Sequence, residues 1–225
     1  MKDISQLLHE AQAGGRSRLS EYESKKVLAA YGIPTVREIM AEDLHQVRAA
    51  AYEIGYPVVL KACSAEVAHK TESALIRLDI RNEAELSEAF NQIQSRVKSA
   101  FLVQEMIKGH RELVVGMVRD HQFGPCVMFG TGGIFTEALG EVCFRAAPLS
   151  ARDALEMMQE TKAGRLLGEL RGLPAVDHNL LCRCLISMGQ IGLEHKEIIE
   201  IDANPIIITG DRPVAVDALV VLGGL

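Results

Sequence analysis

The stretch Pro57–Leu78, PVVLKACSAEVAHKTESALIRL, decides how this chain is interpreted. It begins with an apolar run typical of a buried strand, and that run delivers Lys61 at its end. His69 follows in a polar segment that predicts a loop, and the apolar residues 74–80 predict another strand. A lysine at a strand end can hold phosphate oxygens, and a neutral histidine is a nitrogen nucleophile near pH 7. The stretch therefore favours chemistry on phosphate.

The composition is that of a globular protein with one large domain or two small lobes. The chain has 225 residues, of which 48% are hydrophobic and 4% aromatic, and its formal net charge is -6 at pH 7. An acidic chain with few aromatic rings and no Trp is not expected to bind nucleic acid. We see neither a signal peptide nor an apolar run of about 18 residues, and the 5 cysteines show no pairing rhythm. We therefore expect a cytoplasmic protein with reduced thiols.

The N-terminal part of the chain alternates helix and strand patterns, which predicts an α/β fold. Ser20 and Glu23 form a capping-box pattern at the start of a helix. Asp43 or Glu42 begins a second expected helix that ends at Gly55, and Asn82 begins a third. The expected strands of this part are residues 34–40, 57–60, 74–80 and 101–106.

The C-terminal part begins with two antiparallel strand patterns, joined by a turn at residues 120–124. A glycine loop, Gly130–Gly133, follows the second of them. The remaining expected strands are residues 136–147, 197–203, 205–208 and 214–219, and the expected helices are residues 150–158, 164–170 and 177–191. We therefore expect an N-terminal lobe of residues 1–100 and a C-terminal lobe of residues 101–225.

Residues 103–107 and Glu112 suit a nucleoside. A strand that leads from one lobe into the next can offer backbone N–H and C=O groups to an adenine edge. The Glu112 carboxylate can accept hydrogen bonds from ribose hydroxyls, because it is an acceptor only. The glycine loop at 130–133 would let backbone N–H groups approach a phosphate. The alternative is an exposed hairpin with solvated glutamates and an ordinary glycine turn.

Glu200, Asp202 and Asn204 alternate along an expected strand, so their side chains share one face. Asp217 follows further along the chain. Carboxylate and amide oxygens of this kind suit Mg²⁺ that also contacts phosphate. The alternative is a solvated strand face, although neighbouring Ile199 and Ile201 favour a half-buried position.

Short motifs spread from about residue 19 to residue 221 resemble those of an ATP-grasp domain. More narrowly, the chain is similar to the beta subunit, or beta-like domain, of the NDP-forming acyl-CoA synthetases (acetate–CoA ligase, ADP-forming). The motifs are YGIP from Tyr31, PVVLK from Pro57, HKTE from His69, VQEM from Val103, QFGP from Gln122, MFGTGGIF from Met128, FRAAPL from Phe144 and EIDANP from Glu200. Their order and spacing carry the resemblance.

The resemblance implies an ATP-grasp fold of two lobes, each a sheet flanked by helices, with the nucleotide in the cleft between them. It implies an enzyme that forms ATP or GTP from ADP or GDP, phosphate and an acyl-CoA, and that also runs in reverse. It further implies a partner, a separate alpha subunit with a CoA-binding domain, in a heterotetramer of two alpha and two beta subunits. Neither a nucleic acid nor a membrane is an expected partner.

The resemblance also assigns roles to residues. His69 would receive a phosphoryl group from a histidine of the alpha subunit and pass it to the nucleotide. The other implied roles are phosphate binding by Lys61, adenine binding by Glu105, Met106 and Ile107, ribose binding by Glu112, Mg²⁺ binding by Asn204 and Asp217, and contact of Arg145 with a phosphate oxygen.

One departure from the family pattern follows the HKTE motif, where Ala74 and Leu75 replace two glycines. If that turn needs a positive φ, these residues would resist it and the relay through His69 would be slower or lost. Two alternatives therefore stay open. The chain can be a nucleotide-binding regulatory module in which His69 is inert, or another ATP-grasp carboxylate ligase that works through an acyl phosphate directly.

Overall fold

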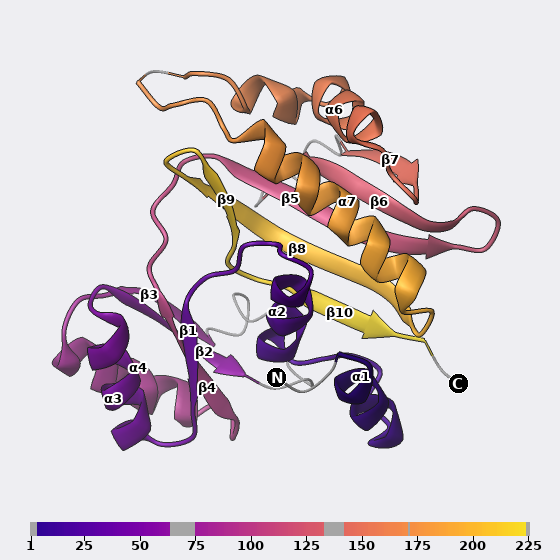
Figure 1. The fold of residues 1–225 in the computed structure, drawn as a ribbon. Coiled ribbons are helices and arrows are strands. Elements are labelled where there is room, and N and C mark those ends of the chain that lie inside the picture. The colour runs from indigo at the N-terminus through magenta and orange to yellow at the C-terminus, as the bar shows by residue number, and fades with distance from the viewer. Residues whose placement is uncertain (1–3, 64–74, 133–141, 171, 224–225) are drawn as a thin grey trace. The chain divides into compact units, whose positions relative to one another are not determined.

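The structure is a computed structural model, and it describes residues 4–63, 75–132, 142–170 and 172–223. The HKTE motif with His69 lies outside the described residues, as do Ala74 and Gly133. The chain forms two compact units, each with an antiparallel sheet and helices (Figure 1). The larger unit contains Met1–Leu19, Glu23–Thr35 and Lys108–Leu225, and the smaller contains Ser20–Tyr22 and Val36–Ile107. This is the α/β fold that the sequence predicts.

The smaller unit is built on a sheet with the strand order β1-β4-β2-β3. Its strands are β1 (Glu38–Ala41), β4 (Ala100–Glu105), β2 (Val58–Cys63) and β3 (Ile76–Ile80), and its helices are α3 (Leu44–Ile54) and α4 (Glu83–Gln94). Asp43 and Asn82 cap the two helices through side-chain oxygens, as expected, and Gly55 ends α3 with a φ of 92°. Residues 58, 60 and 62 of β2 pack in a core with both helices. Lys61 therefore lies on the opposite face of this sheet.

The larger unit has a sheet with the order β10-β8-β5-β6-β7, and β9 pairs with β8. The strands are β5 (Glu112–Asp120), β6 (Gly124–Thr131), β7 (Val142–Ala146), β8 (Ile198–Thr209), β9 (Arg212–Ala215) and β10 (Leu219–Leu222). The helices are α1 (Ile4–Ala13), α2 (Glu21–Ala30), α6 (Ala151–Glu160) and α7 (His178–Glu194), with the 3-10 helix η1 (Lys162–Leu166). In Figure 1, α7 runs across one face of β5, β6 and β8. The other face of this sheet is the one that carries the acidic residues described below.

The chain divides differently from the expected split after residue 100. Helix α1 and most of α2 group with the larger unit because Leu8, Val27 and Leu28 are buried in its core. Residues up to Ile107 stay with the smaller unit because β4 pairs with both β1 and β2. Packing of apolar side chains over long sequence separations sets these boundaries, and a linear pattern of helices and strands does not contain that information.

Three expected elements differ in the structure. The two strands expected on either side of Asn204-Pro205 form one strand, β8, because the register of neighbouring β5 shifts between Leu113 and Val115. A proline is tolerated at such an irregularity, since it has no N–H to donate to the ladder. The single strand expected at 214–219 is two strands, β9 and β10. The helix expected at 164–170 is only the short 3-10 helix η1.

Arg111 holds together the region that precedes β5. Its side chain is buried, with only 2% of the residue exposed, and its guanidinium donates to the carbonyl oxygens of Leu166, Gly168 and Gly210 at 3.2, 3.4 and 2.8 Å. We expect Arg111→Met to lower the free energy of unfolding by about 2–4 kcal/mol, because it leaves three carbonyl groups without this donor. Urea unfolding measures the loss. Arg183→Met on α7 is the control, and an equal loss there would contradict a special role of Arg111.

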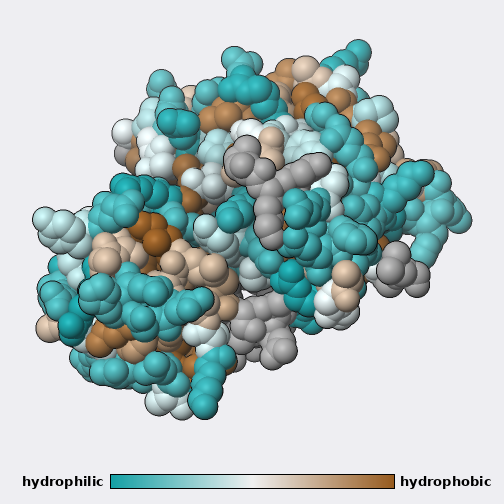
Figure 2. All heavy atoms as spheres, turned by 60° about the horizontal axis from the view of Figure 1, so that its bottom comes forward, coloured by the Kyte–Doolittle hydropathy of each residue, from teal (hydrophilic) through white to brown (hydrophobic). Residues whose placement is uncertain are grey.

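The surface offers no single large apolar face in the view of Figure 2, where hydrophobic residues form small patches between hydrophilic ones. Exposed large apolar side chains come from separate elements, among them Tyr52 on α3 and Phe123 in the β5–β6 turn. Among the described residues, no helix is both long enough and apolar enough to cross a membrane.

Candidate functional site

Lys61 lies within β2 rather than at the strand end that the sequence predicts, since β2 continues to Cys63, and its ammonium group is already paired. Lys61 Nζ lies 2.8 Å from Glu21 Oε1, and the exposed fractions of the two residues are both 4%. Glu21 is the first residue of α2, and Ser20–Tyr22 group with the smaller unit. The candidate phosphate-binding lysine therefore has a buried carboxylate as its counter-ion, which the sequence did not reveal.

Glu105 is the last residue of β4, and Met106 and Ile107 follow it directly. The N–H groups of Glu105 and Met106 donate to the carbonyl oxygens of Arg37 and Pro57, at 3.0 and 3.3 Å. The Glu105 side chain also accepts a hydrogen bond of 2.8 Å from the Arg37 N–H. Two of the three residues expected to bind adenine thus use their N–H groups within the smaller unit. The Glu105 carboxylate also links the end of β4 to Arg37, the residue that precedes β1.

Glu112 is the first residue of β5 and pairs with Ile207 on β8. Its carbonyl oxygen accepts a hydrogen bond of 2.8 Å from Gly132 N. A Cβ at Gly132 would lie 2.3 Å from the carbonyl oxygen of Leu113, so only glycine permits this approach. The expected glycine loop differs from the structure, since Gly130 and Thr131 are the end of β6. Gly132 serves close packing against β5, next to the candidate ribose carboxylate.

The acidic row on β8 has the geometry that the sequence predicts. Ile201 and Ala203 are buried in the core, so Glu200, Asp202 and Asn204 share the opposite face of the strand. Strand β10 pairs Leu219 with Asp202, and Val216 N donates to the carbonyl oxygen of Pro205 at 3.2 Å. Continued by two residues, this antiparallel register brings Asp217 beside Asn204. The structure therefore brings together the two residues expected to bind Mg²⁺.

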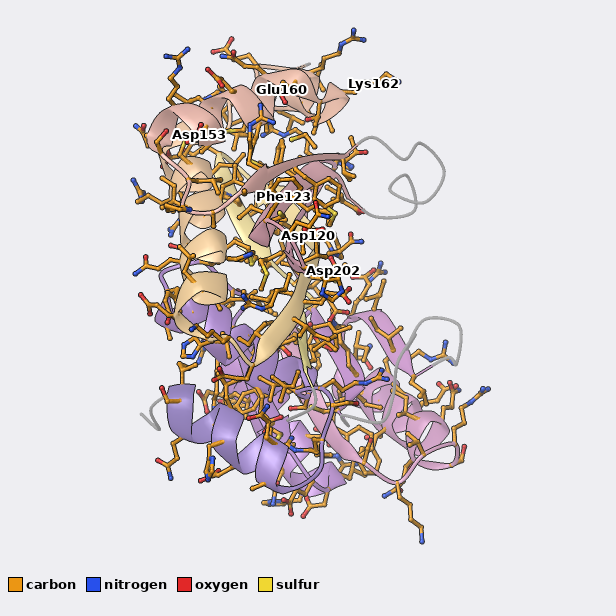
Figure 3. The ribbon with its side chains drawn as sticks, turned by 90° about the vertical axis from the view of Figure 1, so that its right-hand side faces the viewer. Asp120, Phe123, Asp153, Glu160, Lys162 and Asp202 are labelled. Carbon is orange, nitrogen blue, oxygen red and sulfur yellow. The ribbon has the colours of Figure 1, made fainter. Side chains whose placement is uncertain are left out.

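Asp202 belongs to the row that the sequence predicts, although the family resemblance assigns Mg²⁺ binding only to Asn204 and Asp217. Its Oδ1 is buried and has no hydrogen-bond partner among the described residues. Figure 3 labels Asp202. Burial, followed by the nearby charges of Glu200 and Asp217, raises the pKa of Asp202 to about 6. A buried carboxylate without compensation is costly, and a divalent cation would satisfy it. The strict alternation of residues 200, 202 and 204 was the available signal for this role.

The donor set fits a hard cation that is only partly held by protein. Among the residues that the structure describes, no group of three His, Cys, Asp or Glu side chains is arranged to hold a metal ion. Asp202 and Asp217 with the Asn204 amide oxygen are instead a mixed set. Mg²⁺ commonly takes one or two carboxylates and completes its shell with water and substrate phosphates. The residues present are therefore compatible with Mg²⁺ bound together with a nucleotide.

An apolar strip lies beside the acidic row on the same face of the sheet. Gly116 is opposite Asp202 on β5, and Met128 is opposite Gly116 on β6. A Cβ at Gly116 would lie 3.0 Å from Met128 Cε, so the methionine side chain covers the glycine. Phe144 continues the row on β7 and remains 47% exposed. An acidic row and an adjacent apolar strip suit a ligand with a charged part and a flat apolar part.

Arg145 does not lie with these residues. It is opposite Val127, whose side chain is buried in the core on the face covered by α7, so Arg145 points to the helix side of the sheet. Its guanidinium is paired with Glu160 at the end of α6, a residue labelled in Figure 3, and this hydrogen bond raises the pKa of Arg145. The structure thus separates Arg145 from Asp202, and contact of Arg145 with phosphate stays a prediction.

Comparison with known proteins gives one consistent result. The ATP-grasp domain family matches residues 10–222. The beta subunit of acetate–CoA ligase [ADP-forming] I from Pyrococcus furiosus is 39% identical over 225 residues, covering 96% of this chain and 97% of that protein. Acetate–CoA ligase [ADP-forming] I from Archaeoglobus fulgidus is 40% identical over 220 residues, covering 94% of this chain and 32% of that protein.

A solved structure of acetyl-coenzyme A synthetase 1 from Ca. Korarchaeum cryptofilum matches with a TM-score of 0.88 and 40% identity, covering 98% of this chain and 100% of that chain. That protein is in complex with coenzyme A and Mg-AMPPCP, and its phosphohistidine segment points towards the nucleotide binding site. The resemblance drawn from the short motifs is confirmed. The chain belongs to the ATP-grasp family, in the group that includes the beta subunits of ADP-forming acetate–CoA ligases.

Proposed function

We propose that this chain is the nucleotide-binding beta subunit of an ADP-forming acyl-CoA synthetase. With its partner it converts acyl-CoA, phosphate and ADP to the free acid, CoA and ATP, and it catalyses the reverse reaction. GDP and GTP are the other candidate nucleotides. The observation that carries the proposal is the row of oxygen donors on β8, in which buried Asp202 lacks a hydrogen-bond partner among the described residues. The names of the relatives point to the same reaction.

Asp202, Asn204 and Asp217 would hold Mg²⁺ in this proposal. The ion neutralises charge on the nucleotide phosphates, which is its usual contribution to phosphoryl transfer. Lys61 contributes a second positive charge, from the smaller unit. Because phosphoryl transfer depends mostly on positioning and charge stabilisation, these groups suffice for the protein's share of nucleotide activation. Arg145 would take part only if its guanidinium leaves Glu160.

The nucleoside would be held by Glu112 and by the residues that follow β4. Glu112 accepts hydrogen bonds from the ribose hydroxyls, as a carboxylate does best. Glu105 and Met106 use their N–H groups to fix the end of β4, so adenine recognition would rest on the backbone of Ile107 and on carbonyl oxygens. The apolar side chains of Met128 and Phe144 offer a surface beside the metal ligands.

His69 would relay the phosphoryl group in two steps. In the first, a neutral imidazole nitrogen of His69 forms a P–N bond while the P–N bond to a histidine of the alpha subunit breaks. In the second, an oxygen of the terminal phosphate of ADP forms a bond to phosphorus, and the P–N bond to His69 breaks. No oxidant or other reactant is required. A neutral imidazole carries a lone pair on one ring nitrogen, which suits attack on phosphorus.

Leu75, one of the two residues that replace family glycines, fits the backbone of the smaller unit without strain. The Leu75 carbonyl accepts a hydrogen bond of 2.9 Å from Ala62 N, and its side chain is buried in the core of the smaller unit. Among the described residues, Asp79 is the only residue other than glycine with a positive φ. Leu75 therefore needs no glycine-like backbone, which favours a functional relay over an inert histidine.

A separate alpha subunit would complete the enzyme, in a cytoplasmic heterotetramer of two alpha and two beta subunits. The relative from Pyrococcus furiosus is named as a subunit beta, and this chain covers 97% of it. The alpha subunit would supply CoA binding and the first phosphorylated histidine.

The test reconstitutes the full chain with a candidate alpha subunit. We expect ATP formation that requires acyl-CoA, phosphate, ADP and Mg²⁺ together, and no formation by either subunit alone. Calorimetry on this chain alone should show binding of Mg-ADP. Binding of Mg-ADP without turnover in any reconstitution would point to the regulatory module. Release of an acyl phosphate by this chain alone would point to another carboxylate ligase.

A further inference from the structure

A buried polar cluster surrounds Lys61 in the smaller unit. Glu21 Oε1 accepts hydrogen bonds from Lys61 Nζ at 2.8 Å and from Gln104 Nε2 at 2.9 Å. Gln104 Nε2 also donates to Glu38 Oε2 at 2.7 Å. Glu21, Lys61 and Gln104 have exposed fractions of only 4%, 4% and 2%. The cluster is therefore a built arrangement of interior side chains rather than a surface ion pair.

Three strands and one helix contribute to this cluster. Gln104 on β4 is opposite Glu38 on β1 and Val59 on β2, and Lys61 lies two residues beyond Val59 on the same face. All of these side chains are on the face of the sheet away from α3 and α4. Glu21 reaches them from the first turn of α2. The strands thus fix Lys61 and Gln104, and α2 supplies the charge that faces them.

The charges in this cluster do not leave the lysine available to an anion. Among the described contacts, the Glu21 carboxylate accepts from the Lys61 ammonium group and from the Gln104 amide, and the Glu38 carboxylate accepts from the same amide. A buried ammonium group without a counter-ion is costly, so Glu21 stabilises Lys61 in the absence of ligand. A phosphate that binds Lys61 must displace this carboxylate, so Glu21 competes with phosphate for the ammonium group.

We propose that Glu21 is an exchangeable counter-ion of Lys61, which holds the ammonium group in place until a nucleotide phosphate replaces it. This inference rests on the proposed function, in which Lys61 binds phosphate. Glu21 is a positioning residue, since it acts through Lys61 and needs no contact with the nucleotide. It stabilises the ligand-free protein and limits the affinity for nucleotide, so that nucleotide release is easier. An enzyme that works in both directions needs such release.

The variant Glu21→Gln separates the effect of Glu21 on nucleotide affinity from its effect on the stability of the ligand-free protein. Glutamine keeps an oxygen that can accept from Lys61 and Gln104 in the same geometry, but it carries no charge. We expect the full chain with this change to bind Mg-ADP about tenfold more tightly, because a neutral amide competes less strongly than a carboxylate with phosphate for the Lys61 ammonium group. We also expect its ligand-free melting temperature to fall. A purely structural role of Glu21 would lower the melting temperature without tightening nucleotide binding.

A double-mutant cycle measures whether Glu21 acts through Lys61. Lys61→Gln should weaken Mg-ADP binding, and Glu21→Gln should have no further effect on affinity in that background. Glu23→Gln is the matched control, because Glu23 lies on the same helix but pairs with Arg16, at 2.8 Å. Its Mg-ADP affinity should equal that of the wild type. Calorimetry gives the affinities, and thermal unfolding gives the melting temperatures.

The outcomes distinguish this inference from the proposed function. If the wild-type chain does not bind Mg-ADP, both fail. If the wild type binds and Glu21→Gln binds equally well or more weakly, only the role of Glu21 is overturned. Tighter binding that persists in the Lys61→Gln background would overturn it as well. Should Glu21→Gln not fold, Glu21→Asp is the second variant. It shortens the side chain by one methylene, about 1.5 Å, which moves the carboxylate away from the Lys61 ammonium group, so Mg-ADP binding should become tighter by a smaller factor. Unchanged or weaker binding by Glu21→Asp would then overturn it.

Discussion

We expect His69→Ala to abolish the labelled phosphoryl group on this chain and the formation of acyl-CoA by the reconstituted enzyme, while Mg-ADP binding remains close to that of the wild type. The reason is chemical. The proposed relay needs a nitrogen that can form and break a P–N bond reversibly, and alanine has no nucleophile. Nucleotide binding is unaffected because Lys61, Glu112 and the residues around Asp202 are unchanged. The expected loss of turnover is at least about a thousandfold, as for other nucleophiles of covalent catalysis.

The measurement uses ATP labelled on its terminal phosphate, with Mg²⁺, and quantifies acid-labile label on the chain. His110→Ala and His121→Ala are matched controls, since both are exposed histidines of the larger unit. They should retain the label. An absence of acid-labile label on the wild type, or equal label on the wild type and His69→Ala, would rule out the relay. Mg-ADP binding with no label on any form would instead support the regulatory module.

Local patterns predicted well wherever the physical cause is local. Helix caps at Asp43 and Asn82, the buried strand that contains Lys61, and the alternation of Glu200, Asp202 and Asn204 depend on residues a few positions apart. Each of these was readable from the sequence, because side-chain capping and the period of two in a strand act over that range. The family resemblance was readable for the same reason, since it rests on short strings.

Features that depend on distant residues were not predictable. Glu21 lies far from Lys61 in the sequence, and only the folded structure shows that α2 delivers its carboxylate to β2. The continuity of β8 through Pro205 depends on a register shift in β5. Arg145 seemed to belong with the phosphate ligands because it lies in a family motif, yet its side chain is on the helix side of the sheet, paired with Glu160. Those interactions connect separate elements, and spacing along the chain does not encode them.

The second large effect is expected from Asp202→Asn. This change should weaken Mg-nucleotide binding and raise the free energy of unfolding in the absence of Mg²⁺. We expect Asp202→Asn to weaken Mg-nucleotide binding by at least about a hundredfold, because it removes a charged oxygen ligand from a set that has few. In the absence of Mg²⁺ the same change should stabilise the protein. Asparagine has nearly the same shape, and it avoids the cost of a buried carboxylate near Glu200 and Asp217.

The pH dependence of unfolding without Mg²⁺ gives an independent readout. The pKa of Asp202 is raised to about 6 in the folded protein, above the value of 3.8 in an ordinary aspartate. The folded state therefore binds more protons than the unfolded state between these values, so the contribution of this group to stability falls as pH rises from about 4 to about 6. The total is about 2–3 kcal/mol at neutral pH. Asp202→Asn should remove this part of the pH dependence and unfold at higher urea than the wild type at pH 8.

The matched control for Asp202 is Glu200→Gln, which removes a carboxylate from the same face of β8. Glu200 is exposed, so its loss should change Mg-nucleotide binding far less than Asp202→Asn. Calorimetry with and without Mg²⁺ tests the first effect, and urea unfolding at pH 5 and pH 8 tests the second. If Asp202→Asn bound Mg-ADP as the wild type does, Asp202 would not be a metal ligand. If the Asp202→Asn variant were also no more stable than the wild type without Mg²⁺, the Asp202 carboxylate would already be compensated in the wild-type protein. A protein retains a costly buried charge where binding requires it. Lost affinity together with gained stability in Asp202→Asn would therefore identify Asp202 as a residue kept for metal binding at the expense of stability.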